Sequence, residues 1–125
     1  MSELARVEAE HRGDLCVIRL HGEVDISNDR EVLAAIETAM PHSALRLIVD
    51  LTHTTYLDSA GLALLLRLAE RLQARRQQMR IVAPLGSPVR TVLELTGLPR
   101  VIALEGRLED AVRASEQEAG RQESS

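Results

Sequence analysis

The chain has 125 residues, of which 45% are apolar and one, Tyr56, is aromatic. This length suits one ordinary domain with a single core. A net charge of −4 argues against the basic stripe that binds a phosphate backbone, and the lack of aromatic side chains argues against stacking on bases. We therefore expect a protein partner and no direct contact with nucleic acid.

The single cysteine, Cys16, stands in an apolar run and is expected to be a buried free thiol. The chain shows no charged-then-apolar leader, and no apolar run approaches the roughly 20 residues that span a bilayer. These features predict a cytoplasmic protein that does not insert into a membrane. His11, His21 and His42 lack the spacing of metal ligands, so we expect neither a metal nor a cofactor.

The first third of the sequence predicts a hairpin followed by a helix. Apolar and charged residues alternate over 4–10, which indicates a half-buried edge strand, and the denser apolar run 15–20 predicts its antiparallel partner. Ser27, Asn28 and Asp29 each offer a side-chain oxygen that suits a helix start. The apolar residues over 32–40 recur at helical spacing, and Pro41 ends that helix.

The rest of the sequence alternates strands and helices. Residues 45–51 predict a central strand, 52–57 a loop, 59–72 a helix, 79–83 a buried strand, 101–104 a short strand and 108–112 a final helix. Between them, Ser87-Pro88 begins a helix that Gly97 and Pro99 end. We predict an α/β domain over 1–114 with a mixed, mostly parallel sheet, and a polar, disordered tail over 115–125.

Ser59 stands where the predicted loop passes into a helix, and three interpretations are open. Asp58 or Ser59 can act simply as the helix N-cap. Ser59 can be a nucleophile with His53 as its base, although the surrounding residues are not the Gly-x-Ser-x-Gly elbow of hydrolases. It can also be a phosphoacceptor, since a helix N-terminus tolerates phosphate. Gly61 favours more than a cap, because glycine inside a helix is costly unless the backbone is closely approached.

The helix that follows Ser59 has an apolar arc that we expect to face the sheet, formed by Leu62, Leu65, Leu66, Ala69 and Leu72. Arg67, Arg71 and Arg75 lie on the opposite side of the helical projection. Leu64 falls among them, so the spacing predicts an exposed leucine close to Ser59. An exposed leucine at that place is a candidate partner contact.

Two stretches resemble the signature of the STAS domain family, in particular its anti-sigma factor antagonists. They are Val49-Asp50-Leu51 and the run from Tyr56 to Leu62, which reads Tyr-Leu-Asp-Ser-Ala-Gly-Leu. Gly22-Glu23-Val24-Asp25 and Thr96-Gly97-Leu98 resemble two further elements of the family. The resemblance implies a STAS-like domain with helices mainly on one face of the sheet.

The resemblance also implies a non-enzymatic partner switch. An anti-sigma factor that is a serine kinase would bind the unmodified chain and phosphorylate Ser59, and a metal-dependent serine phosphatase would remove the phosphate. Asp25 and Asp58 match the two acidic positions of the family motif beside Ser59. Together with the helix projection, this predicts a partner-binding set of Asp25, Asp58, Ser59, Ala60, Gly61, Ala63, Leu64 and Arg67. A STAS scaffold or accessory subunit of a larger assembly, for example for lipid transport, remains the alternative.

Overall fold

The computed structural model describes residues 4–124, and side chains are described as far as Gly120. None of its described helices is long and apolar enough to cross a membrane. The elements in chain order are β1 (Ala5–Arg12), β2 (Leu15–Val24), α1 (Asp29–Ala39), β3 (Arg46–Asp50), β4 (Thr54–Leu57), α2 (Ser59–Ala74), β5 (Gln78–Val82), α3 (Pro88–Leu95), the 3₁₀ turn η1 (Leu98–Arg100), β6 (Ala103–Glu105) and α4 (Leu108–Ser124).

The strands form one mixed sheet in the order β1-β2-β3-β5-β6, and β4 extends it by pairing with the end of β2. β1 and β2 are antiparallel, whereas the pairs β2–β3, β2–β4, β3–β5 and β5–β6 are parallel. The predicted hairpin, the central position of β3 and the mostly parallel pairing are thus confirmed. Parallel pairing follows from the crossover helices, which return the chain to the same end of the sheet.

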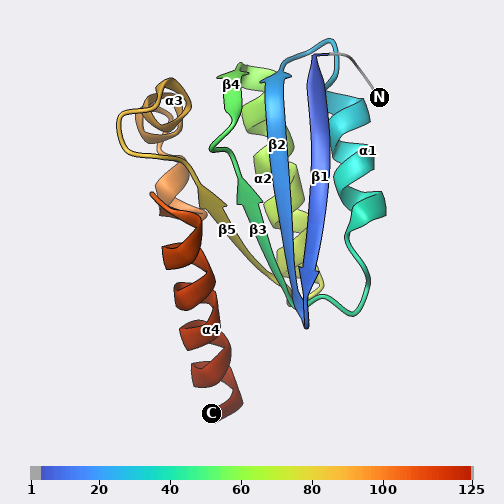
Figure 1. Ribbon diagram of the computed structural model, residues 1–125, viewed down its shortest axis with the longest axis vertical. Coiled ribbons are helices and arrows are strands. Elements are labelled where there is room, and N and C mark those ends of the chain that lie inside the picture. Colours follow the sequence, from blue (N-terminus) through green and yellow to red (C-terminus); the bar gives the residue numbers. More distant parts are fainter. Residues whose placement is uncertain (1–3, 125) are drawn as a thin grey trace.

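Side chains alternate between two apolar layers along the strands. Cys16 and Ile18 on β2 belong to the larger core, which α1, α2 and α3 cover. Val17, between them, belongs to a smaller core under α4. Figure 1 shows α2 running behind the sheet and α1 beside β1, with α4 set apart from both on the β5 side. Most helices therefore cover one face of the sheet. Cys16 lies in the larger core, and this burial raises the pKa of its thiol.

Two expectations about secondary structure were wrong. The predicted loop 52–57 contains β4, a four-residue strand whose Thr54 and Leu57 are buried. The predicted disordered tail continues α4 as far as Ser124. Ser115 is buried and its Oγ accepts a 2.8 Å hydrogen bond from Arg46 Nη1. This contact joins residues that are far apart in the sequence. It stabilises a stretch whose own composition indicates disorder.

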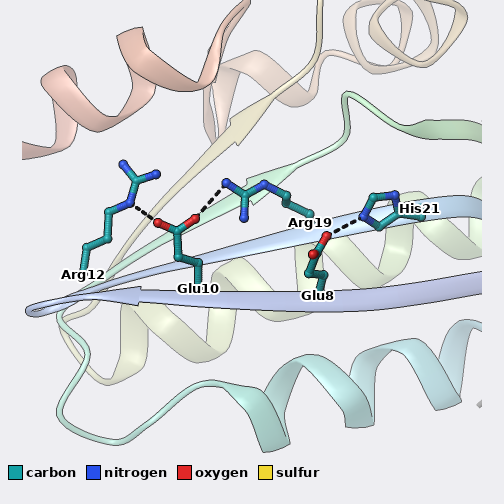
Figure 2. Close-up of polar contacts among 5 residues, drawn as sticks. All are labelled: Glu8, Glu10, Arg12, Arg19 and His21. Atoms are coloured by element: carbon teal, nitrogen blue, oxygen red, sulfur yellow. Dashed lines mark hydrogen bonds and ion pairs between the residues drawn. The ribbon is translucent and has the colours of Figure 1, made fainter.

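α4 does not cover β1 and the neighbouring part of β2. On this side of the sheet, the two strands carry charged and polar side chains in place of a helix. Glu10 contacts the guanidinium groups of Arg12 and Arg19, and Glu8 accepts a 2.8 Å hydrogen bond from His21 Nε2 (Figure 2). The hydrogen bonds from Arg12 and then Arg19 lower the pKa of Glu10 to about 2. These polar side chains pair with one another, so this part of the sheet needs no helix packed on it.

Candidate functional site

Ser59 is the first residue of α2, and Asp58 is its N-cap. Asp58 Oδ1 accepts hydrogen bonds from the backbone N–H groups of Ala60 and Gly61, at 2.9 and 3.1 Å. The capping interpretation is therefore confirmed for Asp58, which leaves Ser59 free of that task. The Ser59 side chain is exposed and makes no hydrogen bond to any other residue of the described range.

The loop between β2 and α1 is held tightly beside Asp58. Asp25 Oδ1 accepts hydrogen bonds from both the hydroxyl and the backbone N–H of Ser27, which lower the pKa of Asp25. Asn28 stands at the N-cap position just before α1, but its side chain makes no capping hydrogen bond. Its buried amide instead accepts a 2.9 Å bond from the Asp25 N–H and donates a 2.8 Å bond to the Glu23 carbonyl.

Asp58 and this loop are joined through Ile26. The backbone N–H of Ile26 donates a 3.3 Å hydrogen bond to Asp58 Oδ2, while the Ile26 side chain remains 81% exposed. The sequence did not single out Ile26, because one apolar residue in a polar loop carries no periodicity that would reveal its exposure. The structure thus brings Asp25, Asp58 and Ser59 to one end of the sheet and adds Ile26.

Gly61 permits the close approach that the sequence predicted. A Cβ atom at this position would lie 2.4 Å from Leu57 Cδ1 and 3.2 Å from the Val24 carbonyl oxygen. The start of α2 therefore packs directly on the ends of β2 and β4. Gly61 is buried, so it positions its neighbours and offers no side chain to a partner.

Gly61→Ala is expected to destabilise the protein by about 1–3 kcal/mol, because an added methyl group forces Leu57 to move in a packed core. Gly120→Ala is the matched control, since a Cβ there has open space and alanine favours a helix by roughly 1 kcal/mol. Urea unfolding of both variants measures the difference. A Gly61→Ala variant as stable as the wild type would contradict the close packing.

The expected orientation of α2 was wrong for two leucines. Leu64, predicted to be exposed, is 2% exposed in the core, whereas Leu66, predicted to face the sheet, is 37% exposed. α2 packs against α1 as well as the sheet, so the buried arc is rotated toward α1 by about 90° relative to the prediction. An ion pair between Arg71 on α2 and Glu37 on α1 joins the two helices on the side where Leu64 is buried. Leu64 is therefore unavailable to a partner in this fold.

The opposite side of α2 borders a hollow that begins at Ser59. The hollow has a volume of about 340 Å³ and is mostly apolar. It meets a larger, more polar hollow of about 640 Å³ at Leu66 and Val101, which line both. We call the first hollow the Ser59 groove; it is lined by Ser59, Leu62, Ala63, Leu66, Thr96, Gly97, Leu98 and Val101.

The predicted site residues therefore divide into three groups. Ser59, Ala63 and Arg67 are exposed, and Asp25, Asp58 and Ala60 are partly exposed. Gly61 and Leu64 are buried. The groove wall formed by Leu98 and Val101 was missed because it comes from a turn about 40 residues along the chain, which only tertiary packing brings to α2.

No catalytic arrangement surrounds Ser59 within the described residues. The His53 ring stacks on His21 with centroids 5.2 Å apart, and no hydrogen bond of the described range joins His53 to Ser59. Residues 4–120 also contain no group of three or more His, Cys, Asp or Glu side chains placed to hold a metal ion. The geometry of the site is that of an exposed hydroxyl beside an apolar groove.

Comparison with known proteins identifies a family and several relatives of this chain. The STAS domain model matches residues 6–119. RsfB, an anti-sigma-F factor antagonist of Mycobacterium tuberculosis, is 29% identical over 104 residues, which are 83% of each chain. The crystal structure of an anti-sigma factor antagonist from Mycobacterium paratuberculosis has a TM-score of 0.79 at 27% identity, covering 88% of this chain and 92% of that one.

A third relative has been solved in a modified state. The structure of the Bacillus cell fate determinant SpoIIAA in its phosphorylated form has a TM-score of 0.65 and is 26% identical, covering 88% of this chain and 99% of that one. These relatives are anti-sigma factor antagonists and share one fold with the chain described above. Since the family model spans most of its length, the chain belongs to the STAS domain family.

Proposed function

We propose that this protein is an anti-sigma factor antagonist that switches partners through Ser59. With Ser59 unmodified, it binds an anti-sigma factor that is a serine kinase and so releases the sigma factor. Phosphorylation of Ser59 by that kinase ends the complex, and a metal-dependent serine phosphatase restores the binding form. The protein itself catalyses no reaction in this scheme.

The observation that carries the proposal is the position of the Ser59 hydroxyl. It is exposed, it has no hydrogen-bond partner in the described chain, and Ser59 lines the Ser59 groove. Asp58 performs the capping that would otherwise occupy a serine at a helix start. A hydroxyl with no structural task, placed on an apolar surface, suits a modification that acts on a partner.

The physical effect of phosphate at this place favours a change in binding over unfolding. A phosphoserine adds about −1.5 to −2 units of charge, which the N-terminus of a helix tolerates. A partner that covers the Ser59 groove would have to remove water from that charge, which lies next to Asp58. That desolvation is costly unless the charge is paired. The relatives that are anti-sigma factor antagonists, one of them solved with phosphate, agree with this scheme.

The test is phosphate mapping on the full chain. The protein is incubated with each anti-sigma factor kinase of its own organism and Mg·ATP, and the site is located by peptide mass spectrometry. We expect one phosphate, on Ser59 and not on the exposed Ser27 or Ser43. Ser59→Ala should remain unmodified, and treatment with a metal-dependent serine phosphatase should return the original mass.

A different outcome would favour the other role considered for a STAS domain. If no cognate kinase modifies Ser59, or if modification leaves binding unchanged, the switch is wrong. Stable co-purification with a larger assembly in the unmodified state would then identify the chain as a scaffold or accessory subunit.

A further inference from the structure

Asp58 contacts two separate parts of the chain with its two carboxylate oxygens. Oδ1 holds the first turn of α2, through the N–H groups of Ala60 and Gly61. Oδ2 holds the loop between β2 and α1, through the N–H of Ile26 at 3.3 Å. The second contact is longer than the first two and is exposed, so it is the weaker side of this bridge.

The loop on the far side of the bridge is held by hydrogen bonds among its own residues, except at Ile26, which Asp58 holds. Asn28 is 1% exposed, and its side chain fixes the Asp25 N–H and the Glu23 carbonyl. The backbone N–H groups of Asn28 and Asp29 both donate to the Asp25 carbonyl. Asp25 itself accepts from Ser27. Within residues 4–124, the backbone of Ile26 makes a single hydrogen bond, the one to Asp58.

We infer that Asp58 is a positioning residue that couples the charge state of Ser59 to the placement of Ile26. Unmodified Ser59 leaves Asp58 bound to the Ile26 N–H, which holds the exposed Ile26 side chain at the same end of the sheet as Ser59. A negative group on Ser59 repels the Asp58 carboxylate, and the longer, exposed bond to Ile26 breaks first. Only the link to phosphorylation rests on the proposed function; the bridge itself does not.

The physical reason is the order of strengths within the bridge. Oδ1 has two donors that point along the helix axis, in the favourable field of the helix N-terminus. Oδ2 has a single, longer bond to a loop. A displacement of the carboxylate therefore loosens the loop before it uncaps the helix. The partner surface would then lose an apolar contact in addition to gaining a charge.

Asp58→Asn separates the two halves of the bridge. Asparagine caps helices as well as aspartate does, so its oxygen can retain the Ala60 and Gly61 N–H groups. Its NH₂ group donates and cannot accept from Ile26. We expect the water-exchange rate of the Ile26 amide, measured by NMR on the full chain, to rise at least threefold. The rates at Ala60 and Gly61 should change by less than about 1.5-fold, as should the rates at all three amides in the control Ser43→Ala, whose exposed side chain lies outside the loop and the bridge.

Charge at residue 59 is tested with a matched pair of equal shape. Ser59→Asp should raise the exchange rate of the Ile26 amide at least threefold near pH 7, and the neutral Ser59→Asn should leave it within about 1.5-fold. The difference should shrink at about 1 M salt, where charges are screened within ~3 Å.

The inference is overturned if Asp58→Asn leaves Ile26 exchange unchanged, if Ser59→Asp and Ser59→Asn behave alike, or if their difference survives high salt. None of these measurements involves a kinase or a partner. A failure of the partner switch therefore leaves the result on Ile26 intact, and a failure here leaves phosphate mapping intact.

Discussion

Ser59→Asp is expected to weaken binding to the cognate anti-sigma factor at least a hundredfold, which corresponds to about 2.7 kcal/mol. Ser59 is exposed and lines an apolar groove, and Asp58 is the preceding residue. A second carboxylate there must lose water when a partner covers it, and an unpaired buried charge costs several kcal/mol. Calorimetric titration of the full chain with the purified anti-sigma factor measures the loss.

Two variants separate charge from shape in this measurement. Ser59→Asn has the size of the aspartate variant without its charge, and Ser59→Ala removes only the hydroxyl. Both are expected to bind within about tenfold of the wild type, because the Ser59 hydroxyl makes no hydrogen bond within the described chain that would be lost. Equal weakening by Asn and Asp would show that Ser59 is a steric contact and that charge is not the switch.

The loss of binding should not come from unfolding. An acidic residue in the first turn of a helix interacts favourably with the helix dipole, by roughly 0.3–1 kcal/mol. We therefore expect Ser59→Asp to unfold at the same urea concentration as the wild type or slightly higher. A clearly destabilised Ser59→Asp protein would remove the basis for interpreting its weak binding as a surface effect.

Leu64→Ala is expected to lower the free energy of unfolding by about 2–4 kcal/mol, with a fall in Tm of about 10 °C. Leu64 is 2% exposed and belongs to the main core, in the layer shared by α1, α2 and the sheet. Removing its side chain leaves a cavity that the close-packed neighbours cannot fill. Urea and thermal unfolding measure the effect directly.

Leu66→Ala is the matched control, because it makes the same truncation two residues along the same helix. Leu66 is 37% exposed and lines the Ser59 groove, so the expected loss of stability is below about 1 kcal/mol. Its effect should appear in the affinity for the anti-sigma factor, which we expect to fall about tenfold. If Leu64→Ala were nearly neutral and Leu66→Ala strongly destabilising, the orientation of α2 described here would be wrong.

The sequence was sufficient for features that depend on neighbouring residues. Ser87 followed by Pro88 predicted the start of α3, and the structure shows Ser87 Oγ accepting from the Arg90 N–H at 3.1 Å. Gly97 predicted its end and has the left-handed φ of +77° that such a position requires. The placement of Ser59 at a helix start is of the same kind, since a cap is formed within three residues.

Features that depend on distant residues were decided by the tertiary structure. β4 is only four residues long and pairs with the end of β2, so although its Thr and Tyr residues favour a strand, it is too short to show a periodic pattern. The helical state of residues 115–124 is supported by side chains of the sheet, among them Arg80, whose Nη2 lies 2.7 Å from Glu118 Oε2. Neither contact can be read from local periodicity.

The sequence by itself determined that a serine stands at the first turn of a leucine-rich helix, because capping and helical spacing are local properties. It did not determine which side of that helix is exposed, and the side predicted from helical spacing was wrong, since leucines occupy more than half of the helix circumference. Packing against α1 buried Leu64, and the return of the chain through η1 placed Leu98 and Val101 opposite Leu66. The surface next to Ser59 therefore exists only in the folded protein, where apolar burial selects one face of α2 for the core and leaves the other beside the groove.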